Sequence, residues 1–227
     1  MERLLIVLPV LLISVIAHEY AHGYAALRQG DPTAYQLGRL TWNPIKHIDP
    51  FMTLILPAVM ALGNGPILGG AKPVPVNPGN YRNYRRGDII VSLAGVATNL
   101  VIAVVLVPLI FAIGALGNAS PSLVPALSVL QAMLVNGVLV NLVLVAFNLL
   151  PIPPLDGSHV VKHLLPPALA LRYQQIGRFG ILILIALLYF GRDILFAWMR
   201  PAYALFAMLL VPGREFLLPS RWMPWVV

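Results

Sequence analysis

A pentad that reads H-E-Y-A-H occupies residues 18–22, at the end of an apolar stretch that begins at Leu4. Residues four apart are separated by about 40° around a helix, so His18 and His22 share one helix face. Two imidazoles on one face supply two ligands for zinc, and Glu19 beside them is placed to take a proton from a metal-bound water. The pentad therefore predicts hydrolytic metal chemistry.

The surroundings of the pentad are those of a membrane segment. No charged residue occurs between Leu4 and Ile16. Ionisable side chains inside a bilayer carry a large free-energy penalty, and they commonly mark a functional site. A hydrolytic zinc site on such a helix favours a protease that cuts peptide bonds within or near the membrane.

Composition agrees with a membrane protein. Hydrophobic residues make up 59% of the 227 residues and charged residues 10%, with a mean hydropathy of +0.84, whereas soluble domains carry about 25% charged residues. The chain has no cysteine, which excludes disulfides and thiolate ligands. Its net charge of +7 comes from basic residues in short loops between apolar runs. This pattern favours a lipid bilayer as the partner and disfavours nucleic acid, and it leaves the oligomeric state open.

The apolar runs predict an all-α, polytopic membrane helix bundle that forms one domain over residues 1–227, with five to six transmembrane segments. Core helices are expected at about 4–27, 89–117 and 124–160, and further helices at about 176–211.

A short membrane-associated β or re-entrant region is expected after the first helix. The segment Phe51–Leu62 is too short to span comfortably and contains Pro57, so it is predicted to be re-entrant or interfacial. The stretch Ala34–Trp42, with its aromatic and leucine residues, is expected to be an edge strand, which would pair with an unwound substrate by strand addition.

Basic residues orient the expected helices, because Lys and Arg favour cytoplasmic loops. If the first helix runs inward and Phe51–Leu62 does not cross, twelve basic residues lie inside and three lie outside. The outer three are then Arg3, Arg192 and Arg200, while Arg214 and Arg221 count as inner. We therefore expect the loop 117–123 outside and the pentad towards the cytoplasmic side, in a bacterial or archaeal plasma membrane.

A catalytic zinc needs a third protein ligand, and Asp156 is the leading candidate. It follows a segment with prolines at 151, 153 and 154, which forbid a regular helix. Irregular backbone at membrane depth is tolerated mainly where it lines a protein cavity or water. Two alternatives remain open on the residues alone: Asp156 caps the following helix, or His159 supplies the ligand.

Three motifs in order make the chain resemble the site-2 protease family of intramembrane zinc metalloproteases. The first is the pentad. The second, A-G-V-A-T-N at residues 94–99, is similar to the family's A-G-P-x-x-N. The third, N-L-L-P-I-P-P-L-D-G at residues 148–157, is similar to its N-x-x-P-x-P-x-x-D-G. Val96 replaces the usual proline and Ser158 a frequent second glycine. The chain resembles a short member without a PDZ or CBS domain.

The resemblance implies a set of roles. His18, His22 and Asp156 would bind one zinc ion per chain, Glu19 would act as general base, and Asn148 would hold the substrate strand or its polarised carbonyl. Substrates would be transmembrane proteins cut during regulated intramembrane proteolysis.

Other polar residues have more ordinary interpretations. Asn99 is expected to be mainly a structural hydrogen-bonding residue between helices. His159 and His163 are expected to be interfacial or packing residues, and the cluster at residues 81–86 a loop facing lipid headgroups. Two other functions remain open: a membrane metal or proton transporter, and an inactive homologue that binds transmembrane helices.

Overall fold

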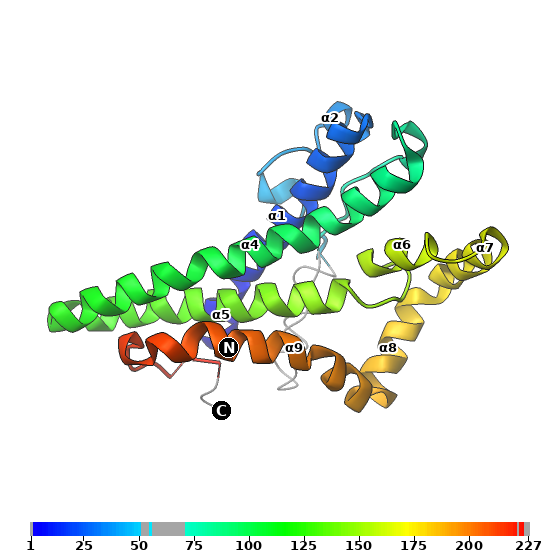
Figure 1. The fold of residues 1–227 in the computed structure, drawn as a ribbon. Helices are drawn as coiled ribbons and strands as arrows, with labels where there is room; N and C mark the ends of the chain where they lie inside the picture. Colours follow the sequence, from blue (N-terminus) through cyan, green and yellow to red (C-terminus); the bar gives the residue numbers. More distant parts are fainter. Residues whose placement is uncertain (1, 51–54, 56–70, 222, 225–227) are drawn as a thin grey trace.

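The computed structural model describes residues 2–50, 55, 71–221 and 223–224 (Figure 1). Over these residues the regular structure is helical, and none of them forms a strand. Five helical stretches in this part are long and apolar enough to cross a membrane, at Leu5–Gln29, Tyr84–Ala119, Pro121–Asn148, Pro167–Phe190 and Arg192–Phe216. The predicted all-α membrane bundle is confirmed.

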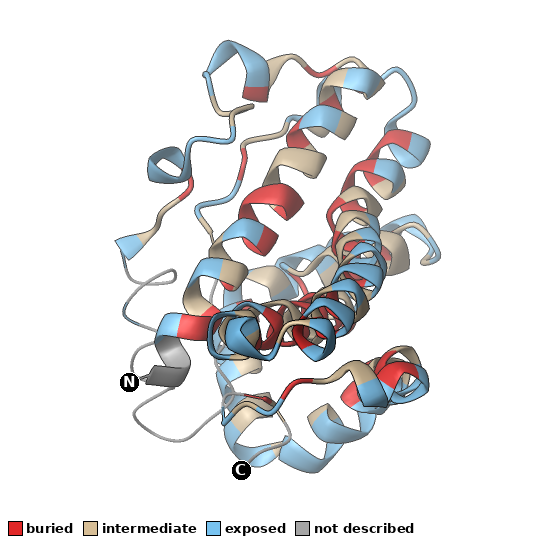
Figure 2. Cartoon of the chain, turned by 90° about the vertical axis from the view of Figure 1, so that its left-hand side faces the viewer, coloured by how far each residue is buried: buried red, intermediate tan, exposed pale blue. Residues whose placement is uncertain are grey.

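The buried residues lie on the faces that the helices turn towards one another, and the exposed residues lie on the outside (Figure 2). Several of the buried side chains are polar, whereas many large apolar side chains are exposed. The side chains of Asn99, Gln131 and Asn141 are fully buried, whereas Val101 and Val105 are 60% and 54% exposed. In water this distribution would be unfavourable. In lipid it is favourable, because polar groups must find their partners inside the protein. The chain is therefore an integral membrane protein.

Three helices form the core around the pentad: α1 (Glu2–Gln29), α4 (Tyr84–Ala119) and α5 (Val124–Asn148). The Asn83 side chain caps α4 by accepting a hydrogen bond from the amide of Arg86. Where the three helices meet, Gly137 of α5 lies so close to Leu106 and Val10 that an added Cβ would be 2.8 and 3.0 Å from their methyl groups. Small residues of this kind let membrane helices approach closely.

The helix α5 ends at Asn148, and the short helix α6 (Asp156–Lys162) begins after the proline-rich segment. The expected core helix at 124–160 is thus interrupted, in line with the irregular backbone predicted for this segment. Gly157 packs against the end of α5, since a Cβ there would lie 2.3 Å from the carbonyl oxygen of Leu149. This contact brings the start of α6 back towards the bundle.

The C-terminal part consists of α7 (Pro167–Ile176), η5 (Gly177–Phe179), α8 (Gly180–Phe190), α9 (Arg192–Leu210) and η6 (Val211–Phe216). The helix α9 lies antiparallel to α5 (Figure 1). Near its start, the Trp198 indole N–H donates to the carbonyl of Ala146 at 2.7 Å. At the other end, the Gln131 amide donates to the carbonyl of Phe216 at 2.8 Å.

This direction of α9 corrects one sequence-based expectation. Arg192 and Arg200 had been expected on the opposite side from the active site, and Arg214 and Arg221 on the same side. The start of α9 instead lies at the end of α5 that leads to α6, and η6 lies beside the end of α4, where the Asn118 side chain donates to the carbonyl of Glu215. The expectation assumed that each predicted helix crosses the membrane. The helix α8 instead begins and ends near the same end of α5, so α9 starts at that end (Figure 1). Arg192 and Arg200 thus replace Arg214 and Arg221 on the side of the active site, so that side still holds twelve basic residues and the other side three.

The expectation of an edge strand at Ala34–Trp42 is also wrong. Residues Thr33–Gln36 form the single-turn helix α2. The Asp31 carboxylate starts this turn by accepting hydrogen bonds from the amide and hydroxyl of Thr33, and Gly38, at a φ of +62°, reverses the chain after it. Trp42 then stacks on Tyr20 of α1, with 4.8 Å between ring centroids. The predicted re-entrant segment Phe51–Leu62 lies outside the described residues, apart from Ile55.

Candidate active site

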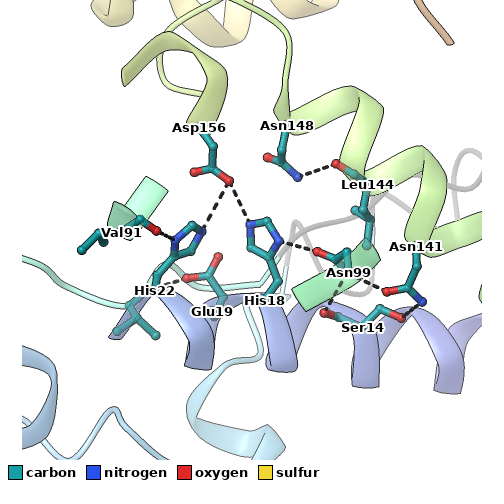
Figure 3. A network of polar contacts seen from close by, with 11 residues as sticks. Ser14, His18, Glu19, His22, Val91, Asn99, Asn141, Leu144, Asn148 and Asp156 are labelled. Carbon is teal, nitrogen blue, oxygen red and sulfur yellow. Dashed lines mark hydrogen bonds and ion pairs between the residues drawn. The ribbon is translucent and has the colours of Figure 1, made fainter. Parts of the chain in front are cut away.

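The two histidines of the pentad and Asp156 converge on one point (Figure 3). His18 and His22 lie one turn apart on α1, with their rings nearly perpendicular and 4.6 Å between centroids. The Oδ2 atom of Asp156, at the start of α6, is 3.2 Å from His18 Nε2 and 3.4 Å from His22 Nε2. Asp156 is therefore brought to the histidines, as expected of a third ligand.

Hydrogen bonds fix which ring nitrogens face Asp156. The Nδ1 atom of His18 lies 2.5 Å from the Asn99 side-chain oxygen, and that of His22 lies 2.7 Å from the backbone carbonyl of Val91. Both partners are acceptors, so each Nδ1 carries the proton and donates it. Each Nε2 then presents a lone pair towards Asp156, which is the orientation that metal-binding histidines adopt.

This donor set fits a tetrahedral zinc ion. Two lone pairs and a carboxylate oxygen that converge without a proton between them repel one another unless a cation lies among them. The buried Oδ2 atom of Asp156 finds no hydrogen-bond donor among the described residues. Ligand atoms about 2.05 Å from a tetrahedral zinc are about 3.3–3.4 Å apart, which agrees with the 3.2 and 3.4 Å observed. Three protein ligands also leave one position for water.

Gly95 of α4 provides the space that the two imidazoles occupy. A Cβ at this position would lie 2.6 Å from the Nε2 atoms of both His18 and His22. Any larger residue would displace both rings. This glycine belongs to the second motif of the sequence, whose role near the metal ligands was not predicted from the residues.

A buried polar network behind His18 holds its ring (Figure 3). The Asn99 amide group donates to the side-chain oxygen of Asn141 at 2.7 Å, and Asn141 donates to the Ser14 hydroxyl at 2.8 Å. Asn99 and Asn141 are fully buried and come from two different helices. Asn99 is predicted from the sequence to be mainly structural, but its position makes it the group that orients the His18 imidazole. The signal available in the sequence was a pair of asparagines in apolar runs.

Glu19 lies beside the two imidazoles (Figure 3), and its carboxylate accepts a hydrogen bond of 2.7 Å from the backbone amide of Val74. Val74 belongs to a non-helical segment that passes along α1. The buried Asp31 carboxylate anchors this segment by accepting from the amide of Asn77 and the side chain of Asn80. The sequence did not single out this segment as a neighbour of Glu19.

Asn148, the last residue of α5, also lies beside the site (Figure 3). One N–H of its amide donates to the carbonyl of Leu144 at 3.0 Å, and the other makes no hydrogen bond within the part of the chain that the structure describes. His159, the alternative third ligand, does not join the convergence point, because its Nδ1 atom is paired with Asp88 at 3.1 Å.

Taken together, the fold and the site are those of a polytopic membrane metallohydrolase. Comparison with known proteins gives the class. The model of peptidase family M50 matches residues 6–133 and 121–189. A zinc metalloprotease by name, YwhC of Bacillus subtilis, is 35% identical over 209 residues, which cover 92% of this chain and 87% of the relative.

Two further relatives carry the name zinc metalloprotease Rip2. The one from Mycolicibacterium smegmatis is 34% identical over 78% of this chain and 64% of its own length. The one from Mycobacterium tuberculosis strain H37Rv is 31% identical over 78% of this chain and 63% of its own length. No solved structure matches the chain significantly. The chain belongs to peptidase family M50, the site-2 protease family, and is a metalloprotease.

Proposed function

We propose that this protein is an intramembrane zinc endopeptidase that cuts peptide bonds in or near the transmembrane segments of other membrane proteins. The observation that carries the proposal is the convergence of His18, His22 and Asp156, with Glu19 beside them, in a bundle whose outer surface is apolar. A hydrolytic centre in such a place is accessible to substrates that themselves lie in the bilayer.

In this proposal His18, His22 and Asp156 hold one zinc ion. Bound zinc supplies Lewis acidity that polarises a water molecule and the scissile carbonyl. Glu19 takes the proton of the water and returns it to the leaving amine. The Val74 amide keeps the Glu19 carboxylate oriented through its 2.7 Å hydrogen bond.

A substrate helix must unwind before its peptide bond can reach the site, because its own turns shield each carbonyl. Unwinding frees backbone groups that need new partners. Asn148 has one N–H available beside Asp156, and we assign it to the substrate carbonyl or to the exposed strand.

We further propose that the site opens towards the cytoplasm of a bacterial cell. The end of the bundle that carries α6 also carries twelve of the fifteen basic residues, once the direction of α9 is taken into account. The positive-inside rule places this end in the cytoplasm. The named relatives are bacterial, which agrees with a bacterial plasma membrane.

The Glu19→Gln variant separates this function from a transporter or an inactive helix-binding protein. It keeps the shape of the side chain and the three ligands but removes the base. We expect it to bind zinc like the wild type and to lose cleavage of a fluorescent transmembrane peptide in detergent. Metal transport into proteoliposomes that persists in Glu19→Gln, with no cleavage by the wild type, would favour the transporter instead.

A further inference from the structure

A second cluster of ionisable side chains lies near the metal site and takes no part in the proposed chemistry. Its centre is Asp88 of α4, which is 2% exposed. His159 Nδ1 and His163 Nε2 approach its two carboxylate oxygens at 3.1 and 2.7 Å, and the Lys162 ammonium forms a close ion pair with it. His159 and Lys162 belong to α6, the helix that begins with Asp156, and His163 is the residue that caps its C-terminal end.

The tyrosine one turn earlier on α4 completes the cluster. The Lys162 ammonium donates to the Tyr84 hydroxyl at 3.3 Å and lies 5.3 Å from the centre of its ring. The Tyr84 ring in turn packs edge-on against His163. With the ammonium of Lys162 already paired to Asp88, the cluster is a set of ion pairs rather than a second metal site.

Asp88 lies on the face of α4 that serves the metal ligands. The spacing 88, 91, 95 and 99 repeats every three or four residues, so these positions share one helix face. Asn99 binds His18, Gly95 makes room for both imidazoles, and the Val91 carbonyl binds His22. One rigid helix thus contacts the two ligands from α1, and through Asp88 it also holds the helix that bears the third.

The short helix α6 needs contacts with the bundle to hold Asp156 in place. The helix has seven residues, and the segment before it contains three prolines that cannot donate backbone hydrogen bonds. The contact of Gly157 with the end of α5 restrains one end of α6. The ion pairs of Lys162 and His163 with Asp88 restrain the other end, one to two turns away from Asp156.

We propose that Asp88 is a positioning residue, which clamps α6 to α4 and thereby holds Asp156 within bonding distance of the metal that His18 and His22 bind. This inference rests on the proposed zinc site and adds a residue to it. Loss of the clamp leaves the C-terminal end of α6 attached to α4 only through the contacts of Lys162 and His163 with Tyr84, among the interactions of the described residues, so Asp156 moves relative to the two imidazoles.

The test is the zinc affinity of the full-length protein in detergent, measured by competition with a chromophoric chelator. We expect Asp88→Asn to weaken zinc binding by about 10- to 100-fold, the range found when residues that orient metal ligands are changed. The matched control is Gln131→Met. Gln131 is equally buried and holds helix ends at the far side of the bundle, through Ile110 and Phe216. This control should lower the melting temperature and leave the zinc affinity unchanged.

A second arm distinguishes positioning from general destabilisation. In an Asp156→Ala background, the weaker zinc binding left to His18 and His22 should not change further when Asp88→Asn is added. His163→Gln removes one contact of the cluster and should weaken zinc binding in the same direction by a smaller factor, which preserves the test if Asp88→Asn does not fold.

The outcomes separate the two proposals. A wild-type protein that binds no zinc overturns the proposed function. A wild type that binds zinc, with Asp88→Asn and His163→Gln within twofold of it, overturns only the clamp. An equal loss of affinity from Asp88→Asn in the presence and absence of Asp156 also overturns the clamp, because the effect would then not pass through Asp156.

Discussion

Replacement of Gly95 by alanine tests the geometry of the metal site with a single methyl group. The added Cβ would lie 2.6 Å from the Nε2 atoms of both His18 and His22, whereas ordinary contacts begin at 3.4 Å. The two rings must therefore retreat by about 0.8 Å. Zinc–ligand distances tolerate deviations of only about 0.2 Å, so the site would lose its metal geometry.

Gly95→Ala should lower activity strongly, although it should slightly stabilise the helix. A misplacement of about 1 Å at a catalytic site reduces activity by about a hundredfold, which is about 2.7 kcal/mol of transition-state stabilisation. Alanine in a helix is about 1 kcal/mol more favourable than glycine, so the variant gains in helix propensity. We expect a folded protein that has weak zinc binding and low kcat/KM.

The matched control is Gly137→Ala on α5. Its new Cβ also meets close neighbours, at 2.8 and 3.0 Å, but these are the terminal methyl groups of Leu106 and Val10, which can rotate away. Zinc content after gel filtration and cleavage of a fluorescent transmembrane peptide are measured for both variants. If Gly95→Ala binds zinc and cleaves as well as Gly137→Ala, the imidazoles do not lie against α4 and the site described above is wrong.

Three further variants address separate parts of the account. Asn99→Leu removes the acceptor that fixes the His18 tautomer, and we expect zinc to bind about 10- to 100-fold more weakly in chelator competition. Asn148→Ala should retain zinc but slow cleavage by an amount worth about 2–4 kcal/mol. In a series of substrate peptides, Gly, Pro or Asn near the cut should accelerate cleavage, because the substrate helix must unwind before hydrolysis. Equal rates across that series, together with a wild-type rate in Asn148→Ala, would contradict the proposed unwinding and holding of the substrate. Asp31→Ala removes the hydrogen bonds that the buried Asp31 carboxylate accepts from Asn77 and Asn80 and should destabilise the fold by about 1–3 kcal/mol. Burial raises the pKa of Asp31, but hydrogen bonds from Asn77, Thr33 and Asn80 outweigh it and lower the pKa. Its stabilisation is therefore present above a pH of about 4 and lost as the pH falls through the lower folded-state pKa, so thermal melts of the wild type and Asp31→Ala should converge in acid.

The convergence of the three proposed metal ligands could be predicted from the sequence because their signals are local. The four-residue spacing of His18 and His22 places them on one helix face, and Asp156 follows a proline-rich segment that cannot form a regular helix. The partners of these ligands could not be predicted, because they lie far away in the chain. Asn99 is 81 residues from His18, and no local pattern says which buried asparagine contacts which histidine.

The errors in the fold have similar causes. The aromatic and leucine residues of Ala34–Trp42 are of types found in strands, but the chain here forms a helical turn beside the hydrogen bonds of Asp31 and reverses at Gly38, which has a positive φ. The direction of α9 depends on whether α7 and α8 cross the membrane beside the bundle. The length and hydropathy of a helix show that it is able to cross a membrane. Its actual position is set by its packing against neighbouring helices, which these two quantities do not describe.

The most direct test of the central claim is X-ray absorption at the zinc edge, recorded on the purified wild type and on Asp156→Ala. We predict about one zinc per chain in the wild type, with a first shell of two imidazole nitrogens and light oxygen ligands. Asp156→Ala should lose most of the zinc, and any zinc that remains should show the two imidazoles with altered oxygen scattering. Full zinc content and an unchanged spectrum in Asp156→Ala would contradict the proposed ligand set of His18, His22 and Asp156.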